Sequence, residues 1–243
     1  MSKYLLIVLV IVLAATTAAT AQKLPPSFSY TIYVRGQPAG KSVTTVKETA
    51  DAYILESHTT VEFGEFQLEL KTSTEADKET FIVRDFYFEG TRMESQIEGE
   101  VTIDGKSVSG QIIENGLASP VDKVSNQPQI IVFENYVIAH EILLARAFLA
   151  SGSDPAKFGM YLPSVTVITG VDVAKGSELS IESETQEAIC DKILVSIQNS
   201  SAFASYYDPQ RGLPVYLAFP STLTEVFLDD FFEDQPVTRY RGQ

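Results

Sequence analysis

Apolar and polar residues alternate along much of this chain, and the pattern leaves few folds open. Over residues 91–104 the odd-numbered positions are mostly apolar or small, whereas the even-numbered positions are all polar. A period of two places successive side chains on opposite faces of a β-strand, so one face of this segment is solvated and the other is buried. The same alternation recurs over residues 53–63, 66–71 and 178–184. The chain is therefore predicted to be mainly β.

Turn-forming residues separate the alternating runs at intervals that fit β-hairpins. The strongest signals are Asp104-Gly105 and Asn115-Gly116, because a two-residue type I′ turn needs positive φ angles, which Asn, Asp and Gly tolerate. We count about eleven or twelve strands on this basis. Successive hairpins of one-sided strands build an antiparallel meander, and its apolar face is covered by curling, by a second sheet or by a helix.

One segment is able to form a covering helix. Residues 135–150 are apolar on nearly every side of a helical wheel, with Asn135 placed to cap the start and Gly152 placed to end the helix. Three ionisable residues interrupt this surface without forming a broad polar face: His140, Glu141 and Arg146. A helix of this kind is expected to be buried rather than to lie on the surface.

The predicted architecture is a curved antiparallel meander sheet or half-barrel with the long helix packed against its concave face. Residues 119–129 and 151–164, each with two prolines, are interpreted as the connections into and out of the helix. The sequence has no internal repeat and no composition shift that would mark a second domain. We therefore expect residues 22–243 to form a single β-rich domain.

Residues 1–21 have the order of a cleaved secretory signal peptide. Lys3 leads into a short apolar run, and small residues end in an A-x-A cleavage site before Gln22. The alternative, a membrane anchor, needs about 20 apolar residues, and this run is shorter. The only cysteine is Cys190, so no disulfide can form within the chain and no lipid-modified cysteine follows the cleavage site. In an exported chain this cysteine usage favours a periplasmic or secreted bacterial protein without stable membrane insertion.

The charge of the chain excludes two classes of partner. Its 18 Lys and Arg residues stand against 32 Asp and Glu residues, for a formal net charge of −14, and the basic residues form no run. Affinity for nucleic acid and for anionic lipid headgroups is built from clustered basic side chains. Neither is an expected partner of this protein, and the acidity is interpreted as a means of solubility.

The sequence offers few groups for catalysis. His58 alternates with acidic residues on the solvated face of a strand, whereas His140 lies in the apolar helix and must find a hydrogen-bond partner there. No H-E-x-x-H, G-x-S-x-G or S-x-x-K motif is present, and Cys190 lacks the basic neighbours that would activate its thiol. We expect no catalytic residue, no metal site and no cofactor. A hydrolase that uses carboxylates or His140 is the less favoured alternative.

Two acidic pairs flank phenylalanines near the C-terminus, Asp229-Asp230 and Glu233-Asp234. Their oxygens are able to bind calcium in principle, but neighbouring carboxylates on a strand point to opposite faces. We interpret these pairs as a solvated acidic edge of a strand.

Two short segments resemble a group of known proteins. Residues 30–41 form a strand that leads into a G-x-P-A-G turn, and residues 206–215 contain the sequence Tyr-Tyr-Asp-Pro-Gln-Arg-Gly-Leu-Pro-Val. Both segments are similar to hairpins of exported bacterial domain-of-unknown-function families. Those families in turn resemble the lipoprotein-carrier (LolA-like) fold, in which a curved antiparallel sheet holds helices in its hollow. The resemblance implies a cavity between sheet and helix that binds an acyl chain or an apolar segment, and it brings no catalytic residues.

The favoured function is that of an exported, non-catalytic envelope protein that binds an apolar small molecule, a lipid or a segment of an envelope protein. His140, Glu141 and Arg146 are its candidate ligand-binding residues, because each must pair with the others, with backbone or with the polar end of a ligand. The alternative is a structural or assembly scaffold whose core is filled, because folding alone explains apolar strand faces.

The N-terminal segment generates the first prediction. The mature protein is expected to begin at Gln22, since the apolar run is short and an A-x-A site precedes that residue. N-terminal sequencing of the protein from its native host measures this directly. Recovery of an intact Met1 from a detergent-extracted membrane fraction would contradict it.

Overall fold

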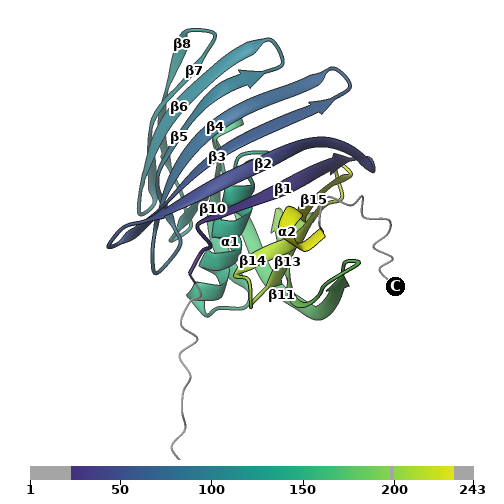
Figure 1. The fold of residues 1–243 in the computed structure, drawn as a ribbon. Coiled ribbons are helices and arrows are strands. Elements are labelled where there is room, and N and C mark those ends of the chain that lie inside the picture. Colours follow the sequence, from purple (N-terminus) through teal and green to yellow (C-terminus); the bar gives the residue numbers. More distant parts are fainter. Residues whose placement is uncertain (1–22, 198–199, 233–243) are drawn as a thin grey trace, which may run out of the picture.

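A single curved sheet of 15 strands makes up most of the computed structural model (Figure 1). The structure describes residues 23–197 and 200–232. The predicted signal peptide at residues 1–21 and the pair Glu233-Asp234 lie outside the described residues. The strand order is linear and does not return to its start, so the sheet is curved without closing into a barrel. This agrees with the curved meander predicted from the sequence.

The first eight strands form one antiparallel meander in which each strand pairs with the next. They are β1 (Ser27–Val34), β2 (Gln37–Glu48), β3 (Ala52–Phe63), β4 (Phe66–Asp77), β5 (Val83–Arg92), β6 (Ser95–Asp104), β7 (Ser107–Glu114) and β8 (Leu117–Val124). The other seven strands form a second meander, antiparallel except for the parallel pair of β9 and β10. They are β9 (Ile130–Val132), β10 (Ala156–Leu162), β11 (Val167–Glu182), β12 (Glu187–Ile197), β13 (Ser200–Asp208), β14 (Leu213–Phe219) and β15 (Thr224–Leu228).

The two meanders meet where β1 pairs with β15, with Tyr30 opposite Leu228. The first and the last strand of the described chain therefore lie side by side at the centre of the sheet. Its two edges are β8 and β9, which are neighbours in the sequence. Figure 1 shows the first meander, from purple to teal, curving over the second, from green to yellow.

The strand count exceeds the predicted eleven or twelve, chiefly because residues 119–129 and 151–164 were interpreted as connections. Each of these two segments contains all or part of a strand, and neither strand has the alternation of apolar and polar residues that marks a half-buried strand. In the edge strand β8 only Val121 is buried, and Pro120 is tolerated because an edge strand does not need every N–H for pairing. In contrast, most of β10 is buried on both faces, and so is all of β9, which follows directly after residue 129. A period-two signal requires one solvated face and one buried face, and none of these strands has both.

One of the two strongest predicted turns is confirmed in place. Asn115 and Gly116 connect β7 to β8 with φ angles of 50° and 79°, the positive values that a type I′ turn requires. The turn at Asp104-Gly105 is displaced by one residue, because Asp104 still pairs with Ser107 and the loop consists of Gly105 and Lys106.

The long helix α1 (Ile138–Ser151) lies within the curve of the sheet (Figure 1). Every residue from Ile138 to Phe148 is buried, and helix residues belong to two apolar clusters shared with the strands. Gly152 ends the helix with a φ angle of 64°, as predicted. The predicted cap at Asn135 is wrong, because the residue at the cap position is Val137 and no side chain caps that end.

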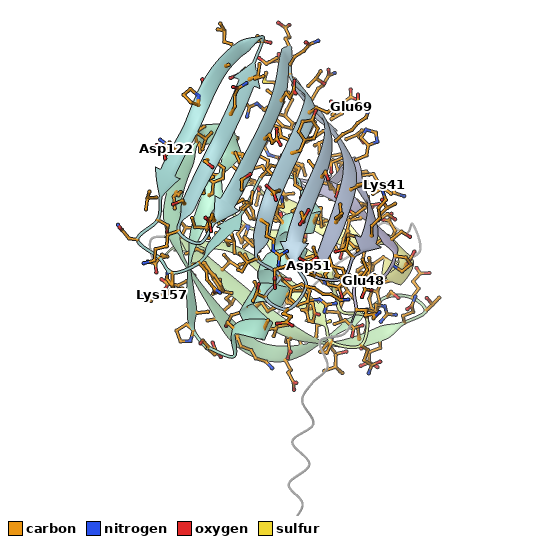
Figure 2. The ribbon with its side chains drawn as sticks, turned by 90° about the vertical axis from the view of Figure 1, so that its left-hand side faces the viewer. Lys41, Glu48, Asp51, Glu69, Asp122 and Lys157 are labelled. Atoms are coloured by element: carbon orange, nitrogen blue, oxygen red, sulfur yellow. The ribbon has the colours of Figure 1, made fainter. Side chains whose placement is uncertain are left out.

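The outer face of the sheet is charged, as the alternation predicts. From Leu55 to Val61 of β3 every odd-numbered residue is buried and every even-numbered residue is exposed. Figure 2 shows charged side chains on the outer side of the sheet, including Lys41, Glu69 and Asp122.

No helix among the described residues is long and apolar enough to span a membrane.

The first acidic pair near the C-terminus differs from the predicted solvated strand edge. Asp229 begins the short helix α2 (Asp229–Phe232). Its carboxylate accepts hydrogen bonds from Ser29 Oγ at 2.6 Å and Thr31 Oγ1 at 2.7 Å, and it pairs with Lys41 Nζ at 2.9 Å. These partners lie on β1 and β2, so Asp229 ties the end of the described chain to the centre of the sheet.

The burial of α1 generates a stability prediction. Leu143→Asp is expected to lower the free energy of unfolding by at least about 4 kcal/mol, because Leu143 is buried and an unpaired carboxylate is costly there. Glu98→Lys on the exposed face of β6 is the control and should stay within about 0.5 kcal/mol of the wild type. Denaturant titration measures both, and equal effects would mean that the two faces are misassigned.

Candidate ligand-binding cavity

A cavity of about 570 Å³ lies between α1 and the inner face of the sheet. Its volume falls within the range of roughly 300–1,000 Å³ that small-molecule sites occupy. The walls come from α1, from strands of both meanders and from the segment that precedes the helix. Most of the lining side chains are apolar: Phe66, Leu68, Phe133, Ile138, Met160, Leu162, Ile197, Phe203, Phe219 and Val226.

The cavity has an exposed rim and a buried floor. The rim includes Val165, which is 58% exposed, together with Ser221 and Thr222. The floor includes Glu141 and Met160, which are fully buried. A molecule that enters from solvent therefore passes a mixed polar and apolar rim and then meets a mostly apolar interior that Glu141 helps to line.

A smaller hollow of about 220 Å³ adjoins this cavity and shares part of its lining, including Leu68, Arg92 and Glu134. It extends along the inner face of the first meander past Phe88 and Ile112.

Glu141 is the most unusual polar group in the cavity. Its side chain is only 1% exposed, and neither of its carboxyl oxygens has a hydrogen-bond partner in the part of the chain that the structure describes. Burial raises the pKa of this carboxyl well above its ordinary value, while the nearby backbone N–H of Glu141 itself, which does not reach hydrogen-bond geometry, acts in the opposite direction to a smaller extent. Most buried polar groups in proteins are hydrogen-bonded, so this exception requires an explanation.

Glu134 lines the same cavity but has its hydrogen bonds satisfied. One carboxylate oxygen accepts from the backbone N–H of Ser164 at 2.7 Å, and the other accepts from the backbone N–H of Asn135 at 3.1 Å. Burial raises the pKa of Glu134, while these two donors act in the opposite direction. The carboxylate thus holds together the segment before α1 and the turn after β10.

His140 lies in the helix with both ring nitrogens engaged. Nδ1 accepts from the backbone N–H of Glu134 at 3.0 Å, so the ring proton is on Nε2, which lies 3.3 Å from Thr74 Oγ1. The ring also packs edge-on against Phe86, at 4.6 Å between centroids. Burial lowers the pKa of His140 to about 3, so the ring is neutral at physiological pH.

Arg146 is also held by the protein itself. Its Nε and Nη2 donate to the carbonyl oxygen of Gly212 at 3.1 and 2.9 Å, and its guanidinium lies over the rings of Phe81 and Tyr207. These contacts anchor α1 to the turn between β13 and β14. Arg146 is not among the residues that line the cavity.

The structure therefore separates the three candidate residues that the sequence groups on one helix. Glu141 lines the cavity, whereas His140 and Arg146 do not. A role of His140 or Arg146 in ligand binding remains a prediction. Because neither residue lines the cavity, each would affect binding by fixing the position of α1. Sequence reasoning did not find Arg92 and Glu134, since no motif marks them and only the fold brings them to the cavity.

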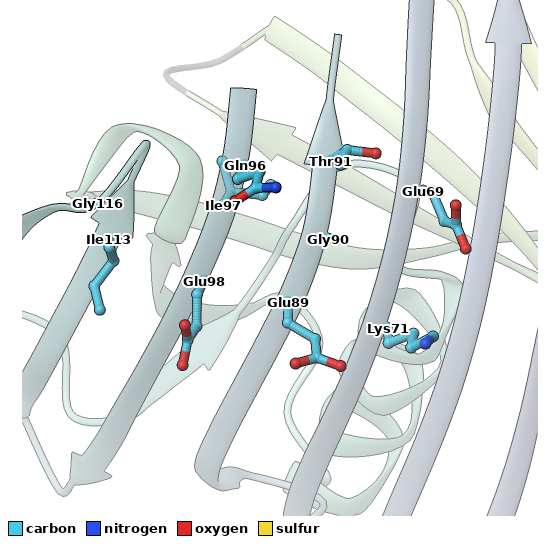
Figure 3. A pocket seen from close by; sticks show the side chains of 10 residues that line it. All are labelled: Glu69, Lys71, Glu89, Gly90, Thr91, Gln96, Ile97, Glu98, Ile113 and Gly116. Carbon is cyan, nitrogen blue, oxygen red and sulfur yellow. The ribbon is translucent and has the colours of Figure 1, made fainter. Parts of the chain in front are cut away.

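A second hollow lies on the outer face of the first meander (Figure 3). Three carboxylates and one lysine line it: Glu69, Glu89, Glu98 and Lys71. Glu69 is within 3.2 Å of His58, and Glu89 accepts from the Tyr87 hydroxyl at 2.9 Å. Within residues 23–197 and 200–232 there is no group of three or more His, Cys, Asp and Glu side chains that could hold a metal ion. The outer hollow is part of the solvated acidic face.

Cys190 is buried in β12, and burial raises the pKa of its thiol to about 12. The thiol is therefore not ionised at neutral pH, in line with the prediction that it is not an activated nucleophile.

The fold and the cavity define a class of protein: a curved β-sheet that wraps a helix and leaves an apolar space beside it. No family model matches the sequence, and no curated protein matches it. Among solved structures, the chain is similar to a β-barrel-like protein of domain of unknown function DUF1849 from Brucella abortus. The identity is 14% and the TM-score 0.50, over 85% of this chain and 95% of that chain.

A DUF1089 family protein from Pseudomonas aeruginosa also matches, with 13% identity and a TM-score of 0.43 over 74% of this chain and 90% of that chain. At such identities the likeness to the DUF1849 protein concerns the fold alone. It agrees with the curved, β-rich fold expected from the sequence.

The neutral, buried state of His140 generates a pH prediction. Because its pKa is about 3 in the folded protein and near 6.5 in the unfolded chain, the unfolded state binds more protons between these values. The contribution of His140 to stability is complete above pH 6.5 and is lost as the pH falls towards 3. Wild type should therefore lose stability faster than His140→Asn in this window, by up to about 1.4 kcal/mol per pH unit. Denaturant titrations at several pH values measure the difference, and parallel curves would contradict it.

Proposed function

We propose that this protein is an exported, non-catalytic binding protein of the bacterial envelope, and that it holds an apolar or amphiphilic small molecule beside α1. The observation that supports this most is the cavity of about 570 Å³ with apolar walls and an exposed rim. Protein interiors are normally packed with few voids larger than a water molecule. A scaffold with a filled core would have side chains in this space.

The contacts of α1 support a preformed site. His140 fixes the first turn of the helix to Thr74 on β4, and Arg146 fixes a later turn to Gly212 after β13. The helix is thus tied to both meanders, and the cavity lies between surfaces that are already held in place. Ligand sites are usually largely preformed in this way.

The charge of the molecule narrows the choice of ligand and partner. The outer face is acidic and the net charge is −14, so nucleic acid and anionic membrane surfaces are unfavourable partners. The export part of the proposal depends on the signal-like order of residues 1–21.

Organic extraction of the protein purified from its native host, followed by mass spectrometry, tests the binding proposal. We expect an apolar or amphiphilic compound in roughly stoichiometric amount, because burial of an apolar molecule is favourable at about 25 cal/mol per Å². After extraction, the protein should bind an uncharged fluorescent probe that carries an alkyl chain. A protein that yields no such compound and binds no probe would be a scaffold instead.

A variant with a filled cavity provides the matched test. Leu162→Trp adds bulk to the cavity wall and is expected to weaken probe binding at least about tenfold, since the space for the ligand is lost. Ile189→Trp, on an exposed position of β12 outside the cavity lining, is the control and should bind as the wild type does. Equal binding by all three proteins would place the probe elsewhere.

A further inference from the structure

The unpartnered carboxyl of Glu141 indicates what kind of ligand the cavity takes, and the inference made from it rests on the proposed function. Glu141 lines the cavity, is 1% exposed and has no hydrogen-bond partner for either oxygen among the described residues. A buried polar group without a partner loses its hydration and gains nothing in return. A partner supplied by the ligand would remove this penalty.

The protein itself does not supply this partner. On the same helix, His140 is engaged with Thr74 and with the backbone N–H of Glu134, and Arg146 donates to Gly212. On β1, Tyr30 is close enough for Glu141 to contribute to its raised pKa, but its hydroxyl donates to the carbonyl oxygen of Pro214 at 2.7 Å.

The charged groups elsewhere in the cavity lining are also engaged. Arg92 pairs with Glu114 at 3.4 Å, and the carboxylate of Glu134 already accepts two backbone N–H groups. The two buried carboxyls of this cavity therefore differ in one respect: Glu134 has its donors within the protein, and Glu141 lacks them.

We propose that Glu141 receives the nitrogen of an amine-bearing amphiphile, whose alkyl chain lies along the apolar walls of the cavity. An ammonium group offers three N–H donors and a positive charge, so it satisfies both carboxyl oxygens with charge-assisted hydrogen bonds. The apolar walls, which include Ile138, Met160 and Phe203, bury the chain.

Other headgroups fit this site less well. A fatty-acid carboxylate has acceptors only, so it pairs with Glu141 only where one proton lies between the two groups, and ionisation of both places like charges at short distance. A fatty alcohol has a single O–H donor and no charge, so it offers Glu141 no charge-assisted hydrogen bond. The net charge of −14 also favours the approach of a cation over that of an anion.

Displacement of the fluorescent probe by three ligands of equal chain length tests the inference: dodecylamine, dodecanol and dodecanoate, each below its solubility limit and the two ionic ligands also below their critical micelle concentrations. We expect the wild type to bind dodecylamine about tenfold or more tightly than the other two, given the strength of hydrogen bonds to charged groups. Glu141→Gln keeps the shape of the side chain and should weaken dodecylamine binding by a similar factor. Dodecanol binding should stay within about twofold.

Two further variants control this experiment. Glu98→Gln removes a carboxylate from the outer acidic hollow and should leave dodecylamine binding unchanged, which separates the cavity from attraction to the acidic surface. Glu141→Met replaces the unpartnered group with an apolar side chain of similar length. It should lose the preference for the amine and unfold at a higher temperature than the wild type, because the buried polar group is gone.

The outcomes separate the two proposals. Equal binding of dodecylamine and dodecanoate by the wild type, or an amine preference that survives in Glu141→Gln, overturns the inference about Glu141 and leaves the cavity proposal standing. Failure of all three ligands to displace the probe overturns the proposed function together with the inference. If neither Glu141 variant folds, the selectivity of the wild type still decides between amine and carboxylate.

Discussion

Enclosure of a helix that is buried on every side is the constraint on which the rest of this structure depends. Buried residues occupy every position of α1 from Ile138 to Phe148, so no side of the helix is suited to water. A flat sheet covers only one side of a helix, whereas a sheet that curves around it covers several. Both meanders curve around α1, and residues of the helix belong to both apolar clusters and to the lining of the cavity beside it. The helix fills most of the hollow but not all of it, and the remaining space is the candidate site.

The sequence predicts the β-rich class and the buried helix because each depends on the composition of a local segment. It predicts strands less well where inward positions carry hydroxyl groups. Ser42 and Thr44 on β2 face Thr59 and Ser57 on β3, with 2.8 Å between the oxygens of each pair, and all four residues are buried. Hydropathy counts such residues as polar, although each hydroxyl has its partner within the sheet. The predicted start of α1 at Asn135 is wrong because a tertiary contact, which the local sequence does not show, holds the segment before the helix. The backbone N–H of Glu134 donates to the ring of His140, and no side chain caps the helix.

The candidate site could be predicted only in part. Three ionisable residues in an apolar helix indicate that something must satisfy them, and the positions of His140, Glu141 and Arg146 follow directly from the sequence. Helical geometry gives their directions relative to each other but not the place where the surrounding sheet leaves space. That place depends on side chains from strands far apart in the sequence, such as Leu68 on β4 and Val226 on β15. Glu141 differs from His140 and Arg146 because the described residues of the sheet provide no hydrogen-bond partner for its carboxyl oxygens.

The pairing of β1 with β15 has a consequence for the order in which the molecule is built. Ser29 and Asp229, which are hydrogen-bonded at the central seam, are 200 positions apart in the sequence. The ribosome therefore releases β1 long before β15, its second partner in the sheet, has been made. Until then one edge of β1 has unpaired backbone N–H and C=O groups. The middle of the finished sheet is the last part to form, whereas its edges, β8 and β9, come from the middle of the chain. If the first meander forms before α1 is available, it is a curved sheet with an open apolar face and no helix to cover it, a state that favours association with other chains.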